Sequence, residues 1–408
     1  MLIFFLPKIN EFLRIHFIQK EFEQINALSQ IQWLGTLLEI FKAFLIVPIF
    51  YQLSRKENPK KLFYFTLCFV IFVVFPCVFF VPMIETILHH TQKAFSDFLI
   101  FQWLNGCLEI IFSFFVTFLL CYERTKALIV LILFQFFIAL GIDFFLLSKN
   151  ISIYIVNIST ACSYGLVVLC FWLFVFRKIK IHPSSRILSL QNRLKDFLKL
   201  HFLPAIEQLL DNLGYIFVIL ASLNLLQENM DYFLVMSYFW GFLLVPVLAF
   251  GEISKKVIST SQKPLKLKLY FIFCVNGFFA FLLSLSYFFT ANIASFLGLH
   301  LSEDAFLIIY KLYPCYIVFI FAYAIKCIFY AKGLFYHSFL VSLAVNLLIY
   351  LPVYLWCEPS LDFIILVFSC GIYLNFFLFL LLFFIFLKAN YARKSRFFKR
   401  ANHHLFGQ

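Results

Sequence analysis

The sequence predicts an all-α polytopic membrane protein with about twelve transmembrane helices in two parallel six-helix repeats. Hydrophobic residues make up 63% of the chain and charged residues only 13%, whereas a soluble domain is roughly half apolar and about a quarter charged. Apolar runs of about twenty residues, the length that crosses a bilayer, recur along the whole chain. Short motifs of the first half also return in the second half at a nearly constant spacing.

The expected spans are apolar runs that end at charged or turn-forming segments. The run 3–19 is the most charged, with Lys8, Glu11 and Arg14. It lacks a basic leader and a small-residue cleavage site, so it is expected to act as its own insertion signal. The first six spans are 3–19, 32–53, 62–88, 97–121, 127–147 and 151–176, and the second six are 201–226, 232–253, 268–297, 304–330, 335–357 and 361–387.

These spans divide the chain into an N-terminal six-helix lobe (1–176) and a C-terminal six-helix lobe (201–387). A basic linker, 177–200, joins them, and its amphipathic stretch Arg186–Leu200 is expected to lie on the inner membrane surface. A basic tail, 388–408, follows the last span.

Basic residues are distributed unevenly between the two sets of loops. Of the 33 Lys and Arg residues, 25 lie in alternate connections, including the linker and the tail. Cytoplasmic loops carry such an excess. Both termini are therefore expected to be cytoplasmic, in a bacterial-type inner (plasma) membrane. The net charge of +13 then indicates contact with anionic membrane lipids and not with nucleic acid.

An internal repeat relates the two halves. Residues 5–13 and 202–210 share five of nine positions, including Pro7 and Pro204, at an offset of 197. Residues 44–49 and 242–247 match at an offset of 198. Because each repeat has an even number of spans, the two copies have the same topology, as in several transporter folds.

Three motifs carry a resemblance to a known family. They are LPAIEQLL at Leu203–Leu210, FLLVPVLAFG at Phe242–Gly251 and FYAKG at Phe329–Gly333. Together with the 6+6 plan, which covers nearly the whole chain, they resemble the MATE family (multidrug and toxic compound extrusion), within the superfamily that includes oligosaccharide-lipid flippases. The chain departs from the family pattern in the tenth span, where Lys311 and Lys326 replace acidic residues.

The resemblance implies a V-shaped pair of six-helix lobes around a central cavity. It also implies export of amphipathic, cationic small molecules by alternating access, in antiport with H⁺ or Na⁺. No other cofactor is implied, and a monomer with two fused halves is expected to suffice.

Two carboxylates in the seventh span are the first candidates for ion or substrate binding. Glu207 and Asp211 are four residues apart and therefore share a helix face, with Asn212 beside them. Intramembrane carboxylates are functional candidates by default. Two carboxylates in one low-dielectric cavity repel, so one of them is expected to hold a proton. The alternative is a hydrated, structural role near the cytoplasmic end.

Three further charged residues lie within spans of the first half. Glu39 and Lys42 are three residues apart and can pair on one face of the second span. Mutual neutralisation explains them, and a switch that opens when a proton or substrate takes one partner is the alternative. Glu109 is in the middle of the fourth span and has no partner nearby in sequence, which makes it a site candidate.

Two basic residues bear on the substrate. If Arg14 and Lys326 face the cavity, an anionic substrate such as a lipid-linked oligosaccharide is favoured, and the protein is a flippase. The alternative is that Lys326 reaches the inner membrane interface.

A membrane-embedded transferase is the alternative from another class. The loops are short, and the sequence contains no GxSxG, HExxH or nucleotide-binding glycine loop. The eleven cysteines form no CxxC pair and lie almost entirely in apolar runs, so neither a metal site nor disulfides are expected. The prediction is a transporter and not an enzyme.

Overall fold

The computed structural model describes residues 32–54, 57–80, 96–147, 153–174, 190–226, 229–261, 263–356, 358 and 360–405. Over these residues the chain forms helices joined by short turns, and no strand. The predicted span 3–19, and with it Arg14, lies outside the described residues.

Five spans of the N-terminal lobe are described, and they match the expected runs. Within this group α3 packs against α6, and α8 packs against both α6 and α7. The elements are α3 (Gln32–Ser54), α4 (Pro59–Phe69) continued by η1 (Val70–Val74) and η2 (Phe75–Phe80), α6 (Ser96–Cys121), α7 (Thr125–Leu147) and α8 (Ile153–Phe174).

The C-terminal lobe contains six spans, several of them built from consecutive helical pieces. The long helix α15 lies at its centre and packs against α11, α12, α13 and α18. The elements are α9 (Leu190–Gly214), η5 (Tyr215–Leu220) and α10 (Ala221–Leu226); α11 (Asn229–Met236), η6 (Ser237–Leu243) and α12 (Val245–Thr260); α13 (Leu265–Ser286), η7 (Tyr287–Phe289) and α14 (Thr290–Phe296); α15 (Glu303–Lys332); α16 (Phe335–Val345), η8 (Asn346–Tyr350) and α17 (Leu351–Trp356); and α18 (Leu361–Leu405).

The ends of α15 illustrate how sequence fixes helix boundaries. The Ser302 hydroxyl accepts a hydrogen bond from the backbone N–H of Ala305, and the acidic Glu303 and Asp304 fill the first turn. Both features stabilise the positive N-terminal end of a helix. At the other end Gly333 has φ 71°, a left-handed conformation that terminates the helix.

One span is sharply bent. The eighth span breaks between η6 and α12, where the two parts diverge by 48°. Pro246 begins the second part, and a π-helical stretch, Ser237–Leu243, precedes the break. Proline and π-helical turns are the usual causes of such bends.

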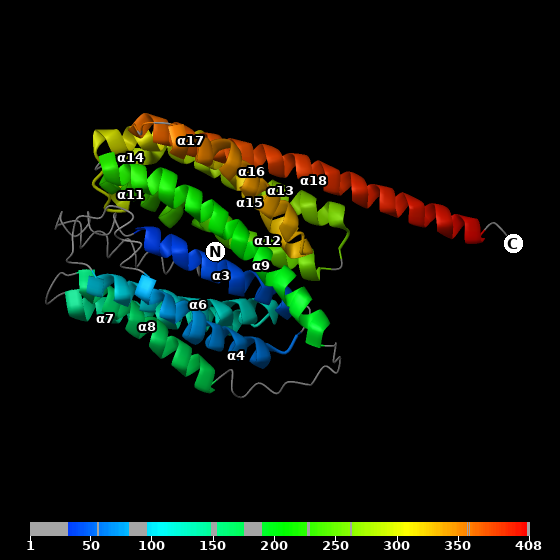
Figure 1. Ribbon diagram of the computed structural model, residues 1–408, viewed down its shortest axis with the longest axis horizontal. Coiled ribbons are helices and arrows are strands. Elements are labelled where there is room, and N and C mark those ends of the chain that lie inside the picture. Colours follow the sequence, from blue (N-terminus) through cyan, green and yellow to red (C-terminus); the bar gives the residue numbers. More distant parts are fainter. Residues whose placement is uncertain are drawn as a thin grey trace.

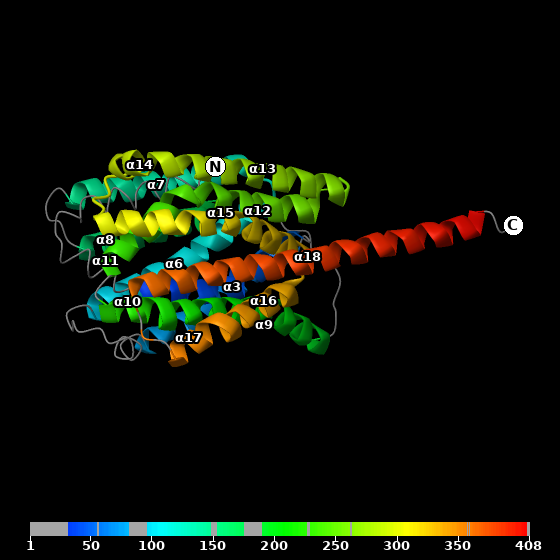
Figure 2. The same ribbon diagram turned by 90° about the horizontal axis from the view of Figure 1, so that it is seen from above.

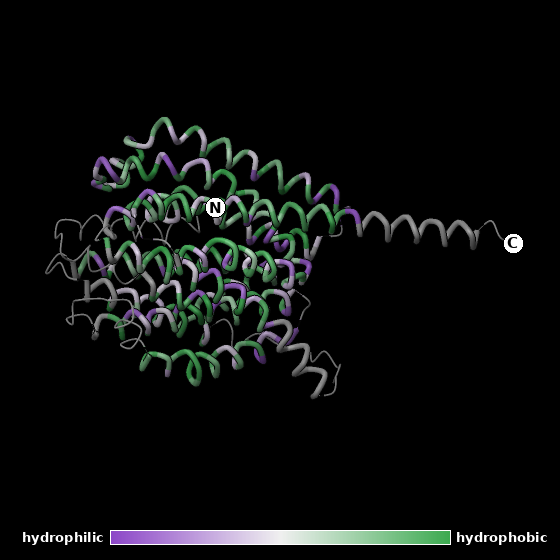
Figure 3. Tube along the Cα trace, turned by 45° about the horizontal axis from the view of Figure 1, so that its top comes forward, coloured by the Kyte–Doolittle hydropathy of each residue, from purple (hydrophilic) through white to green (hydrophobic). Residues whose placement is uncertain are grey.

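The outer surface of the helices is apolar, as a bilayer requires. Nine described helices are long and apolar enough to cross a membrane, the bent pair makes a tenth span, and Ile158–Leu173 is a shorter apolar helix. Large aromatic side chains such as Phe72, Phe144 and Phe296 are more than 70% exposed, which is unfavourable in water and favourable against lipid. Hydrophilic residues gather mainly at the helix ends (Figure 3). The chain is therefore an integral membrane protein.

The two lobes meet along α3 and α9, which run antiparallel between the N-terminal helices and the rest of the C-terminal lobe (Figure 1). The Asn212 side chain donates a hydrogen bond to the Thr36 carbonyl. Further along the same contact, His201 Nδ1 lies 2.8 Å from the Phe44 carbonyl oxygen. This line of contacts is the inter-lobe seam.

Two helices extend past the ends of the expected spans. Residues 190–200, which the sequence places on the membrane surface, are the first turns of α9 and continue into the seventh span without a break. The tail likewise continues α18 as far as Leu405, and this helix extends beyond the others (Figures 1 and 2).

The two ends of the helix bundle differ in charge. The helix ends and connections at one end, which we call the basic end, contain Lys60, Lys126, Lys263 and Lys332. Lys256 pairs with Glu123 there at 3.6 Å, which joins the lobes. The first helical turns at the opposite end contain Asp231, Glu303 and Asp362. The basic end is the one expected to be cytoplasmic.

Candidate functional site

Six of the ionisable side chains described within the spans form two clusters, one in each lobe. Each cluster contains one lysine between two carboxylates. We call Glu39, Lys42 and Glu109 the N-lobe cluster, and Glu207, Asp211 and Lys326 the C-lobe cluster.

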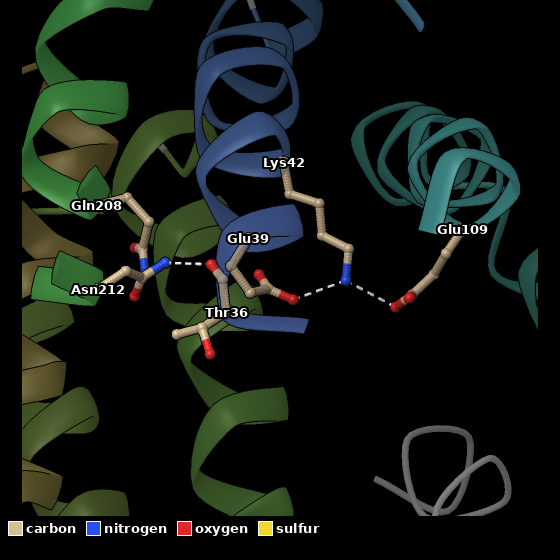
Figure 4. Close-up of polar contacts among 6 residues, drawn as sticks. All are labelled: Thr36, Glu39, Lys42, Glu109, Gln208 and Asn212. Carbon is tan, nitrogen blue, oxygen red and sulfur yellow. Dashed lines mark hydrogen bonds and ion pairs between the residues drawn. The ribbon is translucent and has the colours of Figure 1, made fainter. Parts of the chain in front are cut away.

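The N-lobe cluster joins α3 to α6. Lys42 Nζ lies 2.7 Å from Glu39 Oε1 and 2.7 Å from Glu109 Oε1. The lysine side chain is 17% exposed, whereas those of Glu39 and Glu109 are 51% and 40% exposed. Figure 4 shows that Glu39 and Lys42 leave α3 on the side of α6, away from α9. The carboxylates therefore form the open side of the cluster, and the ammonium lies behind them.

The predicted pair of Glu39 with Lys42 is present, and the structure adds Glu109 to it. The partner of Glu109 is 67 residues away in sequence, which is why no local pattern indicated it. With all three groups ionised, the cluster has one carboxylate in excess. A charge in the hydrocarbon core is costly, so the exposed Glu39 and Glu109 require water or a ligand beside them.

The C-lobe cluster joins α9, α15 and α16 and is more deeply buried. Lys326 Nζ lies 2.6 Å from Glu207 Oε1 and 3.5 Å from Asp211 Oδ2. The Glu207 side chain is 1% exposed. Glu207 and Asp211 face α15 together because they are one helical turn apart on α9.

Two hydroxyl groups complete the C-lobe cluster. Tyr330 Oη donates a hydrogen bond of 2.7 Å to Glu207 Oε2, and Ser342 Oγ donates one to Asp211 Oδ1. The sequence analysis missed both residues. Tyr330 follows Lys326 by four positions on the same helix and was therefore detectable, whereas nothing in the sequence singles out Ser342.

The structure adds a cation to the seventh-span carboxylates. Glu207 and Asp211 share one face, as predicted, but they are not left to repel each other. The ammonium of Lys326 lies between them and compensates one of the two negative charges. The ammonium of Lys326 is thus paired with carboxylates of α9. Its positive charge is compensated within the C-terminal lobe.

Asn212, the third candidate of the seventh span, belongs to the inter-lobe seam. It donates to the Thr36 carbonyl and accepts a 3.0 Å hydrogen bond from Gln208 Nε2. In Figure 4 these side chains lie on the side of α3 opposite to the N-lobe cluster. Asn212 therefore connects the lobes. One face of α3 contributes Glu39 and Lys42 to the N-lobe cluster, and the opposite face forms the inter-lobe seam.

No metal site is found among the described residues. No group of three or more His, Cys, Asp or Glu side chains among them has the geometry to hold a metal ion. The cysteines of the described segments are free thiols.

No protein-family model and no curated protein matches the sequence. Solved structures do match. A MOP superfamily transporter from Pyrococcus furiosus, described as having a binding pocket of reverse polarity that suggests a different function, superposes with a TM-score of 0.71 at 12% identity, over 94% of this chain and 96% of that one. A MATE transporter in the bent conformation gives 0.72 at 12% identity, over 96% and 94%. An outward-facing multidrug resistance MATE family transporter of the MOP superfamily gives 0.67 at 12% identity, over 94% and 96%.

The chain thus has the fold of MATE transporters of the MOP superfamily, over nearly its whole length. Those structures have twelve transmembrane helices in two lobes, which confirms the predicted fold class. The resemblance seen in three short motifs is confirmed at the level of the fold.

Proposed function

We propose that this protein is a secondary active transporter that exports amphipathic cationic small molecules by alternating access, in antiport with H⁺ or Na⁺. The fold supports transport, because MATE transporters share it from end to end. The charge balance of the two clusters is the observation that favours a cationic substrate. Each cluster has two carboxylates and one lysine, so each is net negative when ionised.

The C-lobe cluster has the properties of a coupling site. Glu207 is almost fully buried and Asp211 is 29% exposed, so a proton or small cation that reaches Asp211 changes the charge of the whole cluster. The cluster lies on α9, and α9 forms the seam with α3. A change of charge there acts on the helix that joins the lobes.

The competing function is a flippase for a lipid-linked oligosaccharide or another anionic lipid. It depends on uncompensated positive charge in the spans. Lys42 and Lys326 are each compensated by two carboxylates, and this favours a cationic over an anionic substrate. Arg14, the third residue of that argument, lies outside the described residues.

Orientation and location follow from the same proposal. The basic end faces the cytoplasm, as the excess of Lys and Arg indicates. The protein works in a bacterial-type inner membrane, as a monomer surrounded by lipid, and it is not an enzyme.

Reconstitution in liposomes tests the function. Wild type and Glu207→Gln are compared for uptake of fluorescent cationic dyes under an imposed pH or Na⁺ gradient, with Glu303→Gln as the matched control. Glu303 lies in the exposed first turn of α15, outside both clusters. Gradient-driven uptake by wild type and Glu303→Gln, with at least tenfold less by Glu207→Gln, supports the proposal. Flipping of a labelled anionic lipid without dye uptake contradicts it and favours the flippase.

A further inference from the structure

The ammonium of Lys326 lies at the centre of a set of oxygen atoms. Glu207 Oε1 and Asp211 Oδ2 face it at 2.6 and 3.5 Å. The other oxygen of each carboxylate accepts a hydroxyl hydrogen bond, from Tyr330 and Ser342 respectively. Two carboxylates held by hydroxyl donors, in a site closed to solvent at Glu207, are an environment that binds a small hard cation.

An ammonium group and a monovalent metal ion need the same carboxylate oxygens. We propose that Lys326 is a tethered cation that occupies the place of an inorganic ion between Glu207 and Asp211, so that the C-lobe cluster excludes Na⁺. If the protein is the transporter proposed above, a proton is then the ion that this cluster can exchange.

A second lysine lies near the C-lobe cluster. Lys255 lies 5.7 Å from the centre of the Tyr330 ring, and Lys326 lies 5.6 Å from it. Lys255 is itself paired with Glu252 at 2.5 Å. Glu207 and Asp211 provide the negative charge that binds Lys326, and a Na⁺ ion between them would meet the ammonium group of that lysine. A proton adds to a carboxylate oxygen without needing a coordination shell.

Removing the tethered cation should create a site for a free one. In Lys326→Ala, two carboxylates remain with no positive charge between them, and any small cation that fills the gap stabilises the folded state. The matched control is Lys311→Ala, the same substitution on the same helix. Lys311 pairs with Asp362 at 2.6 Å, but the two side chains are 39% and 78% exposed.

The experiment measures thermal unfolding of the purified full-length protein at constant ionic strength in Na⁺, methylammonium or choline. Wild type and Lys311→Ala are expected to melt at the same temperature in all three. Lys326→Ala is expected to melt lower in choline and to regain at least about 2 °C, saturably, in Na⁺ and in methylammonium. The further change Asp211→Asn should weaken this response, because it removes one of the two carboxylates.

Two results overturn the proposal. One is saturable stabilisation of wild type by Na⁺ that is lost in Glu207→Gln. The other is a Lys326→Ala protein that responds equally to Na⁺ and choline. If this variant is recovered too poorly to melt, the yield of folded protein decides: recovery in Na⁺ but not in choline supports the proposal, and equal recovery, including none, contradicts it. Thermal unfolding reports cation binding and needs no transport. A negative result therefore contradicts the cation proposal and leaves the transport proposal to its own test.

Discussion

The N-lobe cluster provides a quantitative test, since Lys42→Met removes the cation and keeps the length of the side chain. Each carboxylate oxygen is 2.7 Å from Lys42 Nζ, so the two oxygens are separated by at most twice that distance. Two unit charges at this separation repel by about 3 kcal/mol at an effective dielectric constant of about 20. The half-exposed carboxylates reduce this figure through solvent screening, and the lost attraction to the lysine adds to it.

We therefore expect Lys42→Met to lower the free energy of unfolding by about 2–3 kcal/mol, between the values typical of exposed and of buried pairs. Adding Glu109→Gln should restore about half of the loss, because the remaining carboxylate no longer has a like charge beside it. The assay is unfolding in mixed SDS–detergent micelles, analysed as a double-mutant cycle. The control Lys311→Met should cost less than about 1 kcal/mol. Equal losses in the two lysine variants, or strictly additive effects in the cycle, would refute the reasoning.

Three further substitutions test single positions. Tyr330→Phe keeps the ring but removes the hydroxyl that donates to the buried Glu207, and it should cost about 1.5–3 kcal/mol in the same assay; no loss would show that the hydroxyl is not bonded there. Gly333→Ala introduces a Cβ at φ 71° and within 3.1 Å of Tyr51 Cε2, and should cost about 1–2 kcal/mol. Gly277→Ala, in the middle of α13 with nothing within 4 Å of the new Cβ, should be neutral or stabilising by up to about 1 kcal/mol. Equal losses of unfolding free energy in the two glycine variants would show that the left-handed backbone and close contact at Gly333 have no special cost.

The spans were predictable because the bilayer imposes a simple rule. A run of about twenty apolar residues is read locally, without knowledge of any partner. All eleven expected runs from 32–53 onward are helical within the described residues. The bend in the eighth span was not predicted, although Pro246 marks its place. A proline permits a bend, but the packing of the neighbouring helices determines its angle.

The site was predictable as a set of residues and not as a geometry. Charge inside a span is unusual enough to single out Glu39, Lys42, Glu109, Glu207 and Asp211 from sequence. Partners within one helical turn, such as Glu39 and Lys42, were also accessible. The contact between Lys42 and Glu109, and the placement of Lys326 between the seventh-span carboxylates, depend on how separate helices pack. Side chains distant in sequence carry no local signal of such contacts.

The pairing of the charges also changes the argument about substrate. From sequence, an anionic lipid is the alternative substrate if Arg14 and Lys326 face the cavity. In the structure Lys42 and Lys326 each lie between two carboxylates, which favours a cationic substrate. The number of charged residues is therefore less informative than their arrangement.

The most direct test of the account is whether substrate movement drives protons in the opposite direction. Proteoliposomes with an internal pH indicator receive a gradient of a cationic substrate, with no imposed pH gradient. The account predicts an internal pH change that depends on substrate, is retained in Glu303→Gln and is abolished in Glu207→Gln. Substrate flux with no change of internal pH in wild type, or an equal pH change in Glu207→Gln, would contradict it.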